Sequence, residues 1–468
     1  MNGQIDYSQY GDPMPFGPWA QDDVQELSKA LTAGSDINSP GAVAGGGFPL
    51  RLESLDGTLY NLSYRMEHLK LWPQLLKNDV FNTVNEINVL TAHGSGQAFF
   101  HNEGGLPGED DSTWERQYKV VKAMGTTRRY SIMAAMTKMA HADAETHQTL
   151  GGTMWMLEQL ERQLFEGNED LLSVSFNGYD NNGLHVRDLR GRPLTGDEVN
   201  YGAGLIYEAP NYGMATDIYM PVGVDTDFVD DIAPNARYNI NPGGYQNGHA
   251  GMQIKVYDSQ RGPIKLQPNV FIRFGEAPSA VALGAAATRP GAPTQNAALA
   301  AAGTGSQFTA ADAGAYRYKV VGVNEYGKSV PVTMTGAIAV TAGQSVTFSI
   351  NDGSPLSSYY EIHRSTRNGA VGTCVFQMKV ARTGAVTTVT DSNAYIQGTG
   401  HVYLIQQNRE FNKFNRLLRF MKVRLGMVDS SYRFMMLLFG NLVVHAPNKG
   451  LVFINVGRSD RSPTYDVS

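Results

Sequence analysis

The chain of 468 residues contains one cysteine, Cys374, and only 18% of its residues are charged. A single cysteine excludes an internal disulfide and any cysteine-based zinc cluster. No apolar run approaches the length that spans a membrane, since the longest candidate, 434–438, is far too short. The first residues show no basic and apolar secretion signal. We therefore expect a soluble protein made in the cytoplasm, without a membrane partner.

Turn-forming residues are abundant. The chain has 51 glycines and 21 prolines, which favours many turns and loops in a mixed or largely β protein. Its length is consistent with two to four domains, and a hydrophobic content of 42% supports a well-filled interior.

Charge is distributed unevenly along the chain. Residues 1–282 hold 20 basic and 35 acidic side chains, residues 283–400 hold 8 and 5, and residues 401–468 hold 10 and 4. Acidic and basic parts of one chain can pair within one fold or between copies.

The stretch GVNEYGKS, 322–329, fits the pattern of a phosphate-binding loop, with Lys328 as its lysine. Such a loop should open a helix, but Val330-Pro331-Val332-Thr333 follows and favours a strand. We therefore predict a β-hairpin that turns at Asn324 and Gly327, and no nucleotide or other cofactor.

Residues 91–121 form a glycine-rich stretch between strand-like flanks. Loops of this length in a compact domain are usually functional or are arms. A metal site could use His93, His101 and Glu103, but nothing fixes their spacing. We favour a two-stranded tongue with an acidic tip, which would need another surface to lie on because it has too little core of its own.

The stretch HADAETH, 141–147, would place His141, Asp143, Glu145 and His147 on one face of a strand, as a metal site requires. The leucines that follow recur at helical spacing until Gly167. We therefore predict a long amphipathic helix over 143–166 and no metal site.

The remaining host segments alternate between helical and strand patterns. Residues 1–47 resemble an extended arm with a short helix at 21–31, and a helix is expected to end near Trp72, before Pro73. Thr195 caps a predicted helix, and TDIYMPVGVDTDFVDD predicts a buried strand, a turn and a second helix. We interpret Asp225 and Asp227 as part of a solvated first turn, although a pair of functional acids is the alternative.

The amino-acid composition changes over residues 283–400. An Ala/Gly/Thr-rich linker is followed by short strands with turn residues between them, which predicts an inserted all-β sandwich. Residues 409–424 then carry six basic side chains and one acid. This segment could face nucleic acid or be partly buried with its long side chains reaching solvent. Two closing strands flank 446–450.

Several of these stretches together resemble a known family. LFEGNEDL, TDIYMPVGVDTDFVDD, RGPIKL and LFGNLVVHAPNKGLVFINV are similar to the major capsid proteins of contractile-tailed phages with the Hong Kong 97-type fold. YRYKVVGVNEYGKS and YYEIHRSTRNG resemble the immunoglobulin-like module that some of these proteins carry. The strand motifs of this module occur in the reverse of the usual fibronectin order, which leaves its strand order open.

The resemblance implies an α+β fold with named parts. These are an N-terminal arm (1–47), a peripheral (P) domain from 48–194 with an E-loop (91–121) and a spine helix (143–166), and an axial (A) domain. The A domain would cover 195–282 and return at 401–433 after an immunoglobulin-like insert at 283–400. Closing strands at 434–468 would complete the P domain.

The resemblance also implies function: self-assembly into hexamers and pentamers of an icosahedral shell around double-stranded DNA, without catalytic, cofactor or metal residues. Expected partners are scaffold, portal and decoration or cement proteins, with packaged DNA contacted without sequence specificity. The expected contacts of the E-loop with a neighbouring subunit are Phe99, Phe100, Glu109, Asp110, Asp111 and Trp114. No lysine occurs between Asn78 and Tyr118, so the E-loop lysine crosslink of some members is not expected.

Two other functions remain open from the residues alone. A binding or adhesion protein could use the β module to recognise glycan or protein, and a nucleotide hydrolase would use Lys328.

Overall fold

The computed structural model describes residues 63, 65–94, 96, 100–106, 108–137, 143–236, 254–303, 305–427 and 429–459. The predicted arm, its helix at 21–31, and His141 lie outside these ranges. The description below concerns residues 65–136 and 144–459, which belong to one compact unit.

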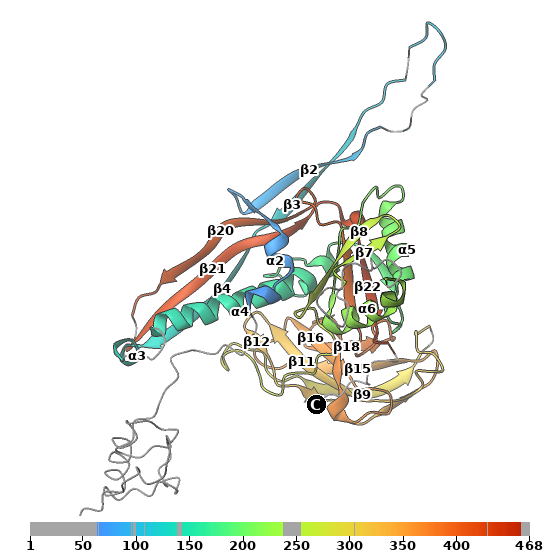
Figure 1. The fold of residues 1–468 in the computed structure, drawn as a ribbon. Coiled ribbons are helices and arrows are strands. Elements are labelled where there is room, and N and C mark those ends of the chain that lie inside the picture. The colour runs from blue at the N-terminus through green and yellow to red at the C-terminus, as the bar shows by residue number, and fades with distance from the viewer. Residues whose placement is uncertain are drawn as a thin grey trace, which may run out of the picture. The chain divides into compact units, whose positions relative to one another are not determined.

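One half of this unit is a four-stranded sheet with a long helix on one face (Figure 1). The helix α4 spans Ala144–Glu166, one residue from the predicted start. The sheet order is β1-β20-β21-β4, formed by Leu76–Asp79, Asn412–Arg424, Ser431–Val444 and Lys122–Ser131. The short helix α3, Ile132–Met136, follows β4.

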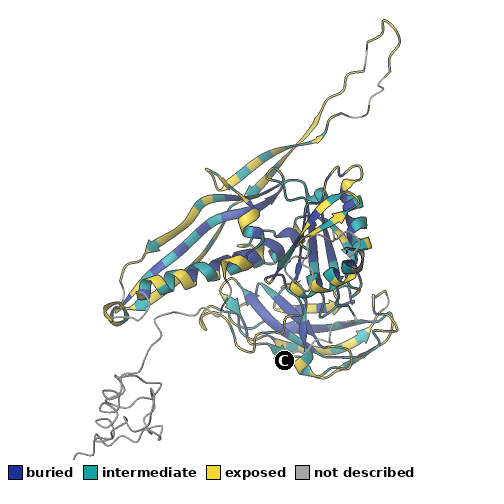
Figure 2. Ribbon diagram, viewed as in Figure 1, coloured by how far each residue is buried: buried dark blue, intermediate teal, exposed yellow. Residues whose placement is uncertain are grey.

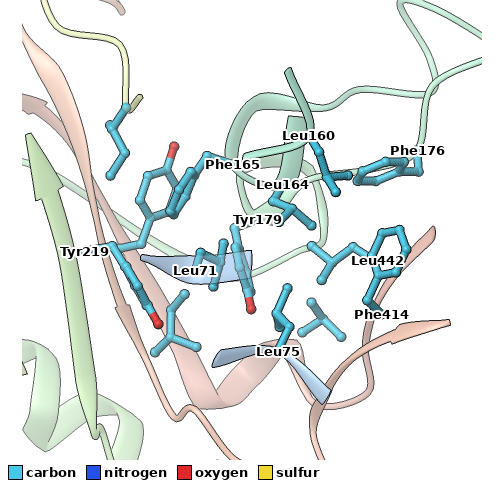
Figure 3. Packing of buried hydrophobic residues seen from close by; sticks show 14 of the residues in the cluster. Leu71, Leu75, Leu160, Leu164, Phe165, Phe176, Tyr179, Tyr219, Phe414 and Leu442 are labelled. Carbon is cyan, nitrogen blue, oxygen red and sulfur yellow. The ribbon is translucent and has the colours of Figure 1, made fainter. Parts of the chain in front are cut away.

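The C-terminal half of α4 is held by a mixed aliphatic and aromatic core. Leu160, Leu164 and Phe165 on the helix pack with residues from both large sheets, among them Tyr219 and Phe414 (Figure 3). The buried residues recur every three to four positions along α4, which is the spacing that places side chains on one face of a helix. This core joins the helix to both sheets.

The other half is a six-stranded sheet in the order β5-β22-β19-β6-β8-β7. Helix α5, Gly196–Tyr207, is capped by Thr195 as predicted, since the threonine hydroxyl accepts from Glu198 N. Helix α6 spans Val222–Ala236. The strands are His185–Asp188, Gly450–Val456, Gly400–Ile405, Asp217–Pro221, Gly262–Asn269 and Val256–Ser259.

A two-stranded ribbon, β2 (Val84–Ala92) and β3 (Thr113–Val120), forms where the tongue was predicted. None of its described residues between 84 and 120 is buried (Figure 2). Apolar and polar residues alternate along β2, as in a strand with one buried face, but neither face of the ribbon is buried among the described residues.

The segment between β8 and β19 contains two antiparallel sheets around a common core, here called the sandwich (294–391). One sheet has the order β12-β11-β16-β17, with β13 beside β11, and the other has the order β18-β15-β9; a small pair, β10 and β14, accompanies them. The immunoglobulin-like assignment of this sandwich stays a prediction. Its strands, β9 to β18, are Thr294–Ala302, Gly314–Tyr316, Tyr318–Asn324, Gly327–Lys328, Val332–Thr333, Ile338–Val340, Ser345–Asn351, Tyr359–Arg364, Val375–Ala381 and Val386–Asp391.

Three local predictions differ from the structure. The helix expected to end near Trp72 is, among the described residues, a 3-10 turn (Met66–His68) and the four-residue helix α2, Leu71–Gln74, which accommodates Pro73 in its first turn. The expected linker contains strand β9, because its alanines pair with β15. Helix α6 begins directly after β6, with no intervening turn.

The expected domain boundary at 433/434 falls inside strand β21. Strands β20 and β21 form one antiparallel hairpin, and this boundary runs through it. The two expected closing strands separate: β21 lies beside β4, whereas β22 lies in the six-stranded sheet beside β19. The turn at 447–449 therefore carries the chain from one sheet to the other.

Candidate assembly surfaces

The ribbon has two chemically different faces. Asn85, Ile87 and Val89 of β2 lie on one face, which lines a groove of about 1500 Å³ with the loops at 410–415 and 445–449. The other face carries Leu90 opposite Trp114 and Val84 opposite Val120. Directly opposite residues share a face of an antiparallel pair, so this face has an apolar pair near each end, with the Glu86–Arg116 ion pair between them. Trp114 is 65% exposed.

The predicted contact residues lie at the end of the ribbon and beyond it. Phe100 is 88% exposed, and Glu109, Asp110 and Asp111 are exposed on the acidic segment that leads into β3. Phe99 lies outside the described residues. The structure brings Asp110 beside Gly94, on the returning side of the tip. The role of these residues in subunit contact stays a prediction.

The four-stranded sheet is covered by α4 on one face. On that face Phe434, Met436 and Leu438 of β21 are buried in the core. On the other face Met435 and Leu437 alternate with them and are only half-buried. Met421 on β20 lies opposite Leu437 and is 41% exposed. We call this second side the open face, formed by Ala123, Gly125, Thr127, Met421, Val423, Met435, Leu437 and Phe439.

The sequence analysis missed the open face, although a signal was present. The run FMMLLF, 434–439, has no polar residue at alternate positions. A strand with one face in water should alternate, whereas a strand buried on both faces reads as a continuous apolar run. The run therefore indicates that both faces of β21 meet another surface.

Basic side chains of β20 pair with acids from the front of the chain. Asp79 on β1 contacts Arg416 and Arg419. Glu145 on α4 lies 2.6 Å from Lys422 and 3.1 Å from Arg424. These pairs show that the two oppositely charged regions do meet within one chain.

The pairing of Glu145 shifts its acidity. The hydrogen bond from Lys422, followed by that from Tyr130, lowers the pKa of Glu145 to about 2. The carboxylate is therefore ionised at neutral pH, and its described partners are Lys422, Arg424 and Tyr130.

The nucleotide and metal interpretations find no support in the described residues. Asn324 Oδ1 accepts from Tyr326 N and Gly327 N, which closes the predicted hairpin, and Lys328 Nζ lies 2.7 Å from Glu361 Oε2. Among the described parts of the chain, no three His, Cys, Asp or Glu side chains are grouped to hold a metal. No helix within the same parts is long and apolar enough to cross a membrane.

The structure combines an exposed ribbon, a four-stranded sheet covered on one face by a long helix, and a six-stranded sheet. This arrangement matches the α+β architecture expected of Hong Kong 97-type capsid proteins. Solved structures that resemble the chain include the capsid of Myoviridae Phage XM1, with a TM-score of 0.45, 10% identity, and coverage of 88% of this chain and 99% of that chain. The encapsulin SrpI complex from Synechococcus elongatus PCC 7942 matches with a TM-score of 0.39 and 10% identity over 87% and 97%.

No protein-family model matches the chain. Its sequence is 25% identical over 451 residues to the putative major capsid protein of Enterococcus phage phiEF24C, and 24% identical over 446 residues to the major capsid protein of Staphylococcus phage K. Both alignments cover 92% of this chain and 95% of the relative. The chain is therefore a homologue of phage major capsid proteins along nearly its whole length, and the predicted resemblance to these proteins is confirmed, whereas the immunoglobulin-like module stays a prediction.

Proposed function

We propose that this chain is the major capsid protein of a tailed phage and builds the capsid shell from copies of itself. Its homology to phage major capsid proteins over 92% of its length supports this function. The same relatives place it in the virion and give no support to an adhesion protein or a hydrolase. No catalytic residue is part of the proposal.

The observation that carries the mechanism is a pair of incomplete surfaces in one chain. The ribbon exposes apolar side chains, Trp114 among them, and the open face exposes apolar side chains of β20 and β21. Exposed apolar area of this kind marks contact sites. We assign the ribbon to the neighbouring subunit's open face, with Phe99, Phe100, Glu109, Asp110 and Asp111 at the end of the contact.

The finer assembly follows from repetition of this contact. A ribbon that reaches a different surface on the next copy makes a head-to-tail contact, which closes into rings when the rotation permits. We assign those rings to hexamers and pentamers, assembled in the host cytoplasm around scaffold and portal proteins. Packaged DNA would lie against the inner face without sequence recognition, and decoration or cement proteins would bind outside.

Two substitutions test the contact. Trp114→Ala removes a large exposed apolar side chain of the ribbon, and Met421→Asp places a charge on the open face. Burying the rest of the Trp114 side chain contributes about 3 kcal/mol at each contact. We expect both variants to give folded subunits, by circular dichroism, that fail to form shells in sedimentation velocity and electron microscopy with scaffold supplied.

The controls are matched exposed residues on the sandwich. Tyr326→Ala and Leu356→Asp alter side chains that are 56% and 57% exposed, and both variants should assemble normally. Normal shells from Trp114→Ala and Met421→Asp would contradict the assigned contact. Failure of the unaltered chain to form particles with scaffold would contradict the capsid function itself.

A further inference from the structure

The sandwich is joined to the rest of the chain by a line of alternating charges. Lys379 Nζ on β17 lies 3.1 Å from Glu166 Oε2, at the last residue of α4. Glu166 Oε1 lies 3.2 Å from Arg273 Nε, and Arg273 Nη1 lies 3.2 Å from Glu361 Oε1 on β16. Glu361 Oε2 meets Lys328 Nζ at 2.7 Å. We call these five residues the charge line.

The charge line is shielded from water. The side chain of Glu361 is 4% exposed, and those of Glu166, Arg273 and Lys379 are between 15% and 19% exposed. Arg273 also lies over the ring of Phe376, with its guanidinium carbon 4.1 Å from the ring centre. A shielded charge that loses its partner is strongly destabilising, whereas an exposed pair contributes little.

The line crosses between the sandwich and the body twice. Lys379 and Glu361 belong to sandwich strands, while Glu166 and Arg273 belong to α4 and to the segment after β8. Lys379 also donates to the backbone oxygen of Glu166, at the end of the helix. If the two separated, Lys379 would lose Glu166 and Glu361 would lose Arg273.

A second attachment joins the six-stranded sheet to the sandwich and to the segment that follows it. Arg190, which follows β5, donates to the backbone oxygens of Gln307 in the sandwich and of Asn393, two residues after it. Asn455 on β22 donates to Ala394 O and accepts from Ile396 N. Arg190 and Asn455 both adopt left-handed backbone conformations, with φ of 54°. Non-glycine residues hold such conformations only where surrounding contacts impose them.

We propose that the sandwich is an internal clamp that fixes the C-terminal end of α4 and segment 271–276 in one position, through the charge line and the Arg190–Asn455 attachment. The sandwich is then a structural part of the capsid subunit and not a tethered, removable module. Lys328, which fits a phosphate-loop pattern in sequence, serves this clamp as the terminal cation of the line.

The clamp predicts an effect at a distance. Glu361 lies on a sandwich strand and is joined to α4 through Arg273 and Glu166, and its cross-strand partner Lys379 contacts Glu166 as well. Glu361→Gln should therefore raise the hydrogen-exchange rate of the backbone amides at 160–166 about tenfold in the unassembled full chain. The amides at 144–150, at the other end of α4, should stay within about twofold.

The control is another ion pair of the sandwich. Asp352 is 3% exposed and pairs with Arg382 at 2.5 Å, outside the charge line. Asp352→Asn should speed exchange within the sandwich but change the amides at 160–166 by less than about threefold. This control separates loss of the line from general loosening of the sandwich.

A milder variant covers the case in which Glu361→Gln does not fold. Lys328 is 32% exposed, so Lys328→Met should fold and raise exchange at 160–166 about threefold. Unchanged exchange at 160–166 in Lys328→Met, or a change confined to the sandwich in Glu361→Gln, would overturn the clamp. The measurement uses single subunits, so its result is independent of whether shells form.

Discussion

Glu161 offers the sharpest test of how the core of this subunit is held. Its carboxylate is fully buried on α4 and accepts hydrogen bonds from three successive backbone N–H groups, those of Lys70, Leu71 and Trp72, at 3.0, 2.7 and 2.9 Å. Asn269 Nδ2 donates to it at 2.9 Å. Burial raises the pKa of Glu161, and the hydrogen bonds from Leu71 N and Trp72 N oppose that shift.

The substitution Glu161→Gln keeps the shape and removes one acceptor. The amide oxygen can replace Oε1, which receives Lys70 N, Leu71 N and Asn269, but the amide nitrogen then faces Trp72 N at the former Oε2. One donor is left without a partner and opposes another donor. An unsatisfied buried donor costs about 1–3 kcal/mol, so we expect a local loss of about 2 kcal/mol.

Hydrogen exchange at the amides of Leu71 and Trp72 measures this loss. A decrease of about 2 kcal/mol in the free energy of local opening corresponds to roughly 30-fold faster exchange. Glu158→Gln is the matched control, because Glu158 lies on the same helix and pairs with Arg162 at 3.5 Å. That helical pair contributes about 0.2–0.5 kcal/mol. Exchange in Glu161→Gln within threefold of the unaltered chain would refute the reasoning.

Two further predictions follow from burial and backbone space. Burial lowers the pKa of His363 to about 4, so the fold favours its neutral form. The contribution of this residue to stability is complete above pH 6.5 and should fall by about 2–3 kcal/mol as the pH drops from 6.5 to 4. Urea titrations of the unassembled chain at stepped pH measure this loss, and His363→Gln should lack the dependence. A Cβ on Gly178 would lie 2.6 Å from Phe165 O, so Gly178→Ala should lower the melting temperature by several degrees. Gly151 lies in open space on α4, so Gly151→Ala should raise the melting temperature slightly. A lower melting temperature for Gly151→Ala alone would contradict this reasoning.

Local patterns predicted most of the elements. The leucine spacing placed α4 within one residue, Thr195 marked the start of α5, and the turn residues Asn324 and Gly327 marked the hairpin of β11 and β12. Each of these signals acts over a few residues, so the surrounding fold does not change its meaning. The prediction of a helix ending near Trp72 was wrong because the backbone there is held by hydrogen bonds to Glu161, about 90 positions later in the chain.

Contacts between distant segments were beyond the sequence patterns. The alanine-rich segment at 294–302 has the composition of a linker, and it becomes strand β9 because β15 offers a partner some 50 positions later. The division of the closing strands between two sheets likewise depends on which partners they meet, β4 for β21 and β19 for β22. Tertiary pairing of this kind decides strand assignment more than intrinsic preference does.

The uneven charge of the chain predicted some ion pairs of the structure but not others. The acidic front and the basic rear were expected to pair, and Asp79 and Glu145 do meet the basic residues of β20. The charge line at the sandwich follows no such block, because Glu166 belongs to the front and Glu361 to the insert, and Arg273 lies between these two acids. Net charge by segment indicates surface pairing, where many arrangements are equivalent. The charge line depends on single residues that only the three-dimensional structure brings together. Its loss should therefore destabilise the C-terminal end of α4 and not the surface as a whole.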